Sequence, residues 1–184
     1  MRVAPSYTEK MNITREHLNN TLTLEHVSPD RFRIKREGQV GAGLGSQTSE
    51  SIFIGDKGWI RRGDGPWKPM PANLKIGEML KEIGNPDKFS DLPPGRTIEG
   101  KETGSEMVDG QQAKVYVVTN IRSTAAGNDE SGDDSVSRTL KLWLNAGGLP
   151  IKFEETADFG QGSTEVINGT IDFTSTPVIE APSQ

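Results

Sequence analysis

Apolar side chains recur at every second position between Tyr7 and Ile34, at Leu22 and Leu24 and again at Phe32 and Ile34. Basic side chains take the positions between and beside the last two, at Arg31, Arg33 and Lys35. A period of two places successive side chains on opposite faces of an extended chain. This segment is therefore predicted to form half-buried β-strands.

A β-hairpin is predicted next along the chain. Its strands are Ser51–Ile54 and Trp59–Arg62, and Gly55–Gly58 forms the turn between them. The residues from Gly41 to Ser49 are predicted to be a flexible connector that precedes the hairpin. The proline-rich run Pro66–Pro71 is expected to end strand pairing, because proline has no backbone donor for a sheet ladder.

One helix is predicted after these prolines. Ile76, Met79, Leu80 and Ile83 are spaced as one apolar stripe of an α-helix, and Gly84-Asn85-Pro86 supplies a stop signal. We expect a helical segment at about 74–91. Because its stripe must be buried against another element, we expect it to lie over the sheet.

Strands resume in the second half of the chain. The predicted strands are Ala113–Thr119 after a turn at Val108–Gln111, Leu140–Leu144, Ile151–Glu155 after a turn at Gly147–Pro150, and Thr164–Phe173. A mobile acidic loop is expected at about 122–137 and a tail at about 175–184. The whole pattern predicts a mainly β (α+β) protein of about 9–11 strands, with a single antiparallel sheet in one domain spanning 1–184 and no parallel βαβ unit.

Composition narrows the possible functions. The net charge of −5 disfavours nucleic acid, since phosphate binding requires an excess of Lys and Arg on one face. The absence of Cys excludes disulfides, thiolate nucleophiles and Cys-ligated metals. No apolar stretch has the length of a membrane-spanning helix, and residues 1–5 show no export signal.

Catalytic, metal and cofactor sites are not predicted. His17 and His26 are interpreted as exposed or strand-edge residues, because no carboxylate stands in metal-ligand spacing with both. The glycines of 41–45 lead into a strand rather than a helix and so do not match a dinucleotide-binding loop. The acidic run 129–134 lacks a complete calcium-loop pattern and is interpreted as solvated charge. The expectation is a protein that is not an enzyme and has no cofactor.

The order of the turn and strand signals is more informative than any single one. Those signals are, in sequence, His26–Arg33, Ile52–Gly55, Gly65–Trp67, Asp109–Gly110, Leu142–Leu144 and Gly148–Glu154. This arrangement resembles the LolA/LolB/LppX group of bacterial envelope carriers of lipids and lipoproteins, over nearly the whole chain. The resemblance implies a strongly curved antiparallel sheet that forms an open half-barrel, with one or a few short helices covering its mouth.

A ligand site follows from combining that implied fold with the apolar pattern. The expected apolar lining comprises Leu22, Leu24, Phe32, Ile34, Ile52, Ile54, Ile60, Met79, Leu80 and Ile83. A head-group rim is expected at the basic and aromatic cluster of Trp59, Arg61, Arg62, Trp67 and Lys68. The alternatives are that the apolar residues fill a closed core, and that the cluster is a set of solvent-facing charges beside core tryptophans.

The resemblance implies a non-catalytic monomer in the periplasm or at the outer face of the cell envelope, with its leader removed from the chain. Its ligand would be a lipid or the acyl chain of a lipoprotein, with peripheral membrane contact and no nucleic acid. An alternative is an interaction or stress-sensor module with the same fold and no permanent ligand, which would receive an envelope protein partner by strand addition. An empty apolar cavity favours the first hypothesis, and a filled core with an exposed apolar patch favours the second.

Overall fold

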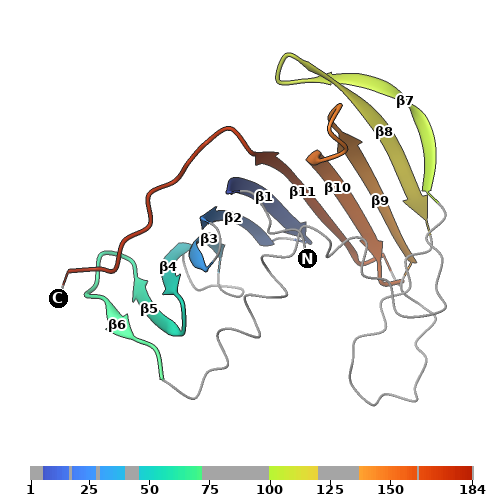
Figure 1. The fold of residues 1–184 in the computed structure, drawn as a ribbon. Helices are drawn as coiled ribbons and strands as arrows, with labels where there is room; N and C mark the ends of the chain where they lie inside the picture. The colour runs from blue at the N-terminus through green and yellow to red at the C-terminus, as the bar shows by residue number, and fades with distance from the viewer. Residues whose placement is uncertain are drawn as a thin grey trace. The chain divides into compact units, whose positions relative to one another are not determined.

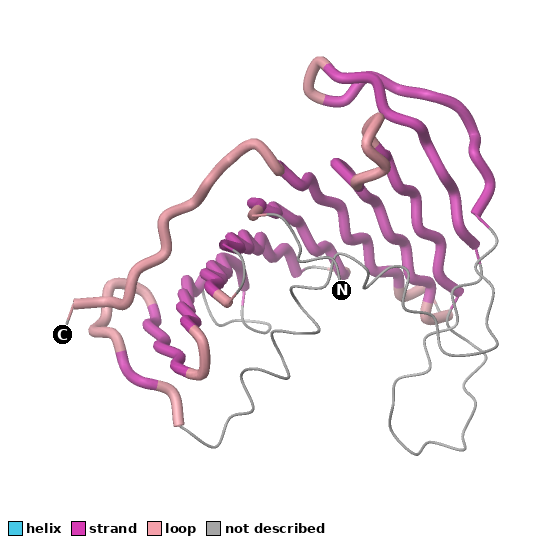
Figure 2. The backbone as a smooth tube through the Cα atoms, in the orientation of Figure 1, coloured by secondary structure: helices cyan, strands magenta, loops and turns pink. Residues whose placement is uncertain are grey.

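The computed structural model describes residues 6–16, 18–27, 30–39, 46–71, 100–119, 137–160 and 162–183 of the 184-residue chain. No helix lies within these ranges, and strands account for most of them (Figure 2). The described part therefore contains no helical segment with the length and hydropathy that a membrane crossing requires.

Within the described residues, eleven strands form one antiparallel sheet (Figure 1). The order across the sheet is β6-β5-β4-β3-β2-β1-β11-β10-β9-β8-β7, so the first and last strands of the chain are neighbours. The strands are β1 Tyr7–Arg15, β2 Leu18–Val27, β3 Arg31–Gln39, β4 Ser46–Ile54, β5 Lys57–Arg62, β6 Lys68–Pro69, β7 Gly100–Val108, β8 Gln111–Thr119, β9 Ser137–Leu144, β10 Pro150–Asp158 and β11 Thr164–Asp172.

The prediction of a mainly β fold with a single antiparallel sheet is confirmed in the described part of the chain. The predicted turns between β4 and β5 and between β7 and β8 are present. Gly55 has a φ of 60°, and the second turn places both Asp109 and Gly110 at positive φ. Both turns use the left-handed region of backbone conformation, which Gly and Asp tolerate better than most other residues.

Two segments that were predicted to lie outside the strands take part in them. β4 begins at Ser46, inside the segment that was expected to be a flexible connector. Its polar first half is a strand because each of its residues pairs with a residue of β3, beginning with Ser46 and Gln39. Lys68–Pro69 forms the short strand β6 where the prolines were expected to end strand pairing. Pro69 is tolerated there because β6 is an edge strand, and the next residue, Met70, supplies the backbone donor to the Gly58 carbonyl at 2.8 Å.

Two compact units can be described separately. Unit 1 contains residues 1–11, 20–94 and 171–184, and unit 2 contains 12–19 and 95–170. The core of unit 1 contains Tyr7, Leu24, Phe32, Ile52, Phe53, Ile171 and Ile179. The core of unit 2 is built around Trp143, with Val108, Ala113, Val115 and Ile151.

The predicted helix at 74–91 lies outside the described residues, and with it Met79, Leu80 and Ile83. The predicted acidic loop at 122–137 also lies outside them, apart from Ser137, which begins β9. The expected tail is described over 175–183 and follows β11 without forming a strand (Figure 1).

Candidate functional site

The register of β2 to β5 divides the side chains of unit 1 between two faces. Leu24 pairs with Ile34, Ile34 with Ser51, and Ser51 with Ile60, so these four side chains share one face, which we call face A. The alternate row places Glu25, Arg33, Ile52 and Trp59 on the opposite face, which we call face B.

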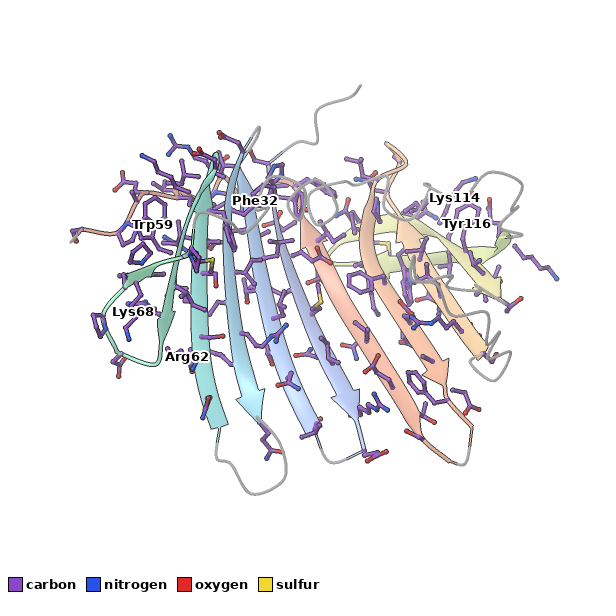
Figure 3. All side chains as sticks on the ribbon, turned by 90° about the horizontal axis from the view of Figure 1, so that it is seen from below. Phe32, Trp59, Arg62, Lys68, Lys114 and Tyr116 are labelled. Atoms are coloured by element: carbon purple, nitrogen blue, oxygen red, sulfur yellow. The ribbon has the colours of Figure 1, made fainter. Side chains whose placement is uncertain are left out.

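The predicted apolar lining is divided between these faces. Leu22, Leu24, Phe32, Ile34 and Ile60 share face A, whereas Ile52 and Ile54 lie on face B. Phe53, which was not among the predicted residues, is the large apolar side chain of β4 on face A, where it pairs with Phe32, which is labelled in Figure 3. In the consecutive run Ile52-Phe53-Ile54 every residue is apolar, so the sequence gives no alternation from which to choose a face.

Face A of unit 1 combines a buried aromatic row with more accessible aliphatic side chains from the neighbouring rows. His26, Phe32 and Phe53 occupy the aromatic row and are buried. Leu22, Ile34 and Ile60 retain intermediate exposure. An apolar ligand therefore has accessible aliphatic side chains to contact on this face.

His26 is buried rather than exposed, contrary to the sequence expectation, with only 2% of its surface accessible. Its ring stacks on Phe32 at 4.6 Å between centroids and lies 5.1 Å from Tyr7. Glu9, on the strand that carries Tyr7, is also buried. Burial, and secondarily the Glu9 charge, raise the pKa of Tyr7 well above its usual range, so the phenol stays neutral. His17 lies outside the described residues.

Face B is packed against the C-terminal tail. The Arg31 guanidinium donates a hydrogen bond to the carbonyl oxygen of Ile179 at 2.8 Å, and the Ile179 side chain is 2% exposed. Nearer β11, the Ser175 hydroxyl donates to the Thr8 hydroxyl at 2.9 Å. The tail therefore occupies part of the face that carries Ile52 and Ile54.

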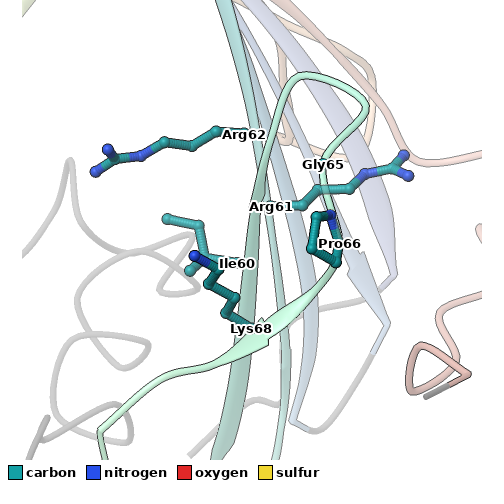
Figure 4. A pocket seen from close by; sticks show the side chains of 6 residues that line it. All are labelled: Ile60, Arg61, Arg62, Gly65, Pro66 and Lys68. Carbon is teal, nitrogen blue, oxygen red and sulfur yellow. The ribbon is translucent and has the colours of Figure 1, made fainter.

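The predicted head-group rim is also divided between the faces. Trp59 and Arg61 lie on face B, where Arg61 donates from Nε to Glu50 at 2.8 Å and sits 4.8 Å from the centroid of the Trp67 ring. Arg62 and Lys68 lie on face A instead, and Figure 4 shows Arg61 pointing away from both. The five residues are therefore divided between the two faces, although Arg61, Arg62 and Lys68 line one hollow.

Two hollows border face A at its basic end. One, of about 360 Å³, is lined by Ile60, Arg61, Arg62, Gly65, Pro66 and Lys68 (Figure 4). The other, of about 250 Å³, is lined by Asn20, Arg36, Gly38, Gln47, Thr48, Ser49 and Arg62. Arg62 belongs to both. Sequence reasoning missed Arg36, whose place beside Arg62 depends on the pairing of three strands.

Unit 2 carries a polar network on its strands β7, β8 and β9. Glu102 of β7 accepts hydrogen bonds from Tyr116 at 2.8 Å and Lys114 at 3.2 Å, both on β8 (Figure 3). Trp143 donates from Nε1 to Glu106 at 2.8 Å. No group of three His, Asp or Glu side chains that could hold a metal ion occurs among the described residues.

No family model matches the sequence, and no curated protein matches it. Solved structures do match. LprF from Mycobacterium bovis superposes with a TM-score of 0.58 at 13% identity, over 98% of this chain and 90% of LprF. The lipoprotein LppX from Mycobacterium tuberculosis gives 0.51 at 12% identity, over 96% of this chain and 90% of LppX. The chain has the LolA/LppX-like fold.

The LolA/LppX-like fold is what the order of turns in the sequence predicted. A LolA superfamily protein from Nitrosomonas europaea is also similar, at a TM-score of 0.32 and 10% identity, over 96% of this chain and 89% of that protein. That likeness is too distant to support an argument. At these identities the LolA/LppX-like assignment establishes the arrangement of the backbone and not a ligand.

Proposed function

We propose that this protein is a non-catalytic carrier in the bacterial cell envelope that binds a lipid or a lipoprotein acyl chain on face A of unit 1. The observation that carries the proposal is the set of accessible aliphatic side chains on this face, Leu22, Ile34 and Ile60, the last of which also lines a hollow with Pro66. Apolar sites of this kind bury most of a ligand against aliphatic and aromatic side chains.

Three further observations support this reading. The LolA/LppX-like fold agrees with the resemblance from which carrier activity was expected, and LppX is itself described as a lipoprotein. The buried His26 stacks on Phe32 and lies beside Tyr7, within the apolar core of unit 1. The tail occupies part of face B, whereas Leu22, Ile34 and Ile60 of face A keep intermediate exposure.

A matched pair of substitutions tests the proposal. Ile60 and Ile54 have the same side chain and the same intermediate exposure, but lie on faces A and B respectively. Ile60→Asp should weaken binding of a neutral fluorescent diacylglycerol by tenfold or more, because a carboxylate replaces apolar contact surface. Ile54→Asp should leave the affinity within about twofold.

The readout is a fluorescence titration of the full chain, with thermal melting of both variants as a check on folding. Equal loss in the two variants, or no binding by the parent protein, would contradict the proposal. The second outcome would favour the interaction-module alternative. That alternative rests on β7, an edge strand on which every residue except Val108 is exposed, including Met107 at 67%.

A further inference from the structure

Arg36 and Arg62 occupy one cross-strand row of face A. Arg36 pairs with Ser49, and Ser49 pairs with Arg62, so the two arginines flank a small side chain. Their backbones are two strand spacings apart, or about 10 Å. The 250 Å³ hollow lies at this row and is lined by both arginines and by Ser49.

Among the described residues these two guanidinium groups have no carboxylate partner, unlike three other arginines of the sheet. Arg33 pairs with Glu25 and Glu50, Arg61 with Glu50, and Arg138 with Glu155. No described carboxylate lies within ion-pair distance of Arg36, Arg62 or Lys68. In a protein with a net charge of −5, this is a local excess of positive charge.

The remaining lining of the hollow suits an anion with several oxygens. Asn20 and Gln47 contribute amide donors and Ser49 a hydroxyl donor, in addition to the two guanidinium forks. A carboxylate has two acceptor oxygens, whereas a phosphate group presents more acceptors and matches arginine bidentately. The donor set therefore favours phosphate.

The polarity of face A changes in a fixed direction along its strands. The Arg36 row is followed by the Ile34 row two residues away and by the Phe32 row four residues away, a distance of about 13 Å along the strand. A ligand lying along this direction would meet cationic, then aliphatic, then aromatic side chains. That sequence of environments matches a charged head group joined to an acyl chain.

We infer that face A selects lipids with an anionic phosphate head group, which Arg36 and Arg62 hold while the acyl chains lie against Ile34, Ile60 and Phe32. Lys68, next to Ile60 in the sheet register, adds positive charge at the edge of the same face. This inference rests on the proposed function, since it names the lipid class for the same surface.

The test compares two lipids with identical acyl chains, phosphatidylglycerol and diacylglycerol, presented separately to the full chain in phosphatidylcholine vesicles. The protein is then separated from vesicles by gel filtration, and the lipid that stays with it is quantified. This separation distinguishes a bound lipid from adsorption of the protein to a charged vesicle surface. Retention of phosphatidylglycerol should exceed that of diacylglycerol by about tenfold, the ratio expected from one charged hydrogen bond.

The decisive variant is Arg36→Gln/Arg62→Gln, which should lower the retention of phosphatidylglycerol about tenfold, to the level of diacylglycerol, and so abolish the preference. Its control is Lys35→Gln/Lys57→Gln, which removes the same charge from the same two strands at exposed positions of face B. The control should keep the preference, and melting curves should show both variants folded.

The outcomes separate the inference from the proposed function. Equal retention of both lipids by the parent protein would overturn the inference and leave the carrier proposal standing. A preference that survives in the arginine variant, or that is lost equally in the lysine control, would also overturn it. Retention of neither lipid would overturn both.

Discussion

Tyr7 is a titratable group whose charged form is excluded by its surroundings. Burial, together with Glu9, raises the pKa of Tyr7 above its usual range. The folded protein therefore holds the phenol proton more tightly than the unfolded chain does. The resulting stability is fully present below the unfolded pKa, about 10, and is lost as the pH rises above it.

We expect Tyr7→Phe to flatten the alkaline decline in the free energy of unfolding. The second tyrosine, Tyr116, is half-buried on β8, and its hydrogen bond to Glu102 raises the pKa of its phenol as well. Tyr116→Phe should therefore flatten the decline less than Tyr7→Phe does, and it leaves Tyr7 as the one tyrosine whose ionisation is followed. Absorbance at 295 nm would follow ionisation, and Tyr7 should ionise only as the protein unfolds. Ionisation of Tyr7 in the folded protein, before any loss of structure, would refute this account.

Glu106 shows the opposite shift. The hydrogen bond from Trp143, followed by that from Lys141, lowers the pKa of this carboxyl below the usual glutamate value. Stability from this group is present above the unfolded pKa and is lost as the pH falls through the lower, folded pKa. Glu106→Gln should therefore reduce the acid dependence of the free energy of unfolding, measured by urea titrations from pH 6 down to pH 2. An unchanged acid slope in the variant would contradict the assignment.

The side chains of face A show which part of the candidate site could be predicted from the sequence and which part could not. Leu22, Leu24, Phe32 and Ile34 alternate with polar residues, and all four lie on face A, as their shared period requires. Ile52, Phe53 and Ile54 are all apolar, and only the pairing of Phe53 with Phe32 determines which of them joins that face. Arg36 and Arg62 meet only through the register of β3, β4 and β5, which no local pattern contains.

At the scale of elements, the tail illustrates how one side chain can fix an irregular segment. Ile179 is 2% exposed, whereas its neighbour Val178 is 72% exposed. Ile179→Asp should destabilise the protein by about 3 kcal/mol, because it buries a charge and removes apolar contact. Val178→Asp should change stability by less than about 0.5 kcal/mol. Chemical denaturation of the two variants would check this, and a similar effect of both would mean that the tail is not anchored by Ile179.

The elements most accurately predicted were those bounded by strong turn signals. Gly55 and the pair Asp109-Gly110 marked hairpins that the structure contains. β6 and the start of β4 were missed because their composition is proline-rich or polar. β6 is a strand because it pairs with β5, and the start of β4 is a strand because it pairs with β3. Their own β-propensity does not predict this.

At the scale of the whole molecule, the sheet joins the two ends of the sequence, since β1 lies between β2 and β11. Pairing of segments so far apart in the sequence costs loop-closure entropy before the contacts between them can stabilise the fold. We expect folding in milliseconds to seconds, observable by stopped-flow tryptophan fluorescence. Double-jump experiments would separate this phase from isomerisation of the 11 prolines. A main folding phase in the microsecond range would contradict the prediction.

The exposed strand β7 has a consequence for the protein at high concentration. A sheet that does not close offers its last strand as a template for further chains, and β7 is nine residues long. Its register is interrupted between Glu102 and Gly104, and Gly104 has a φ of 145°, so a straight incoming strand cannot match it throughout. Charged residues at Lys101, Glu102 and Glu106 add electrostatic repulsion between copies. The irregularity of this strand thus acts as a barrier to fibril growth.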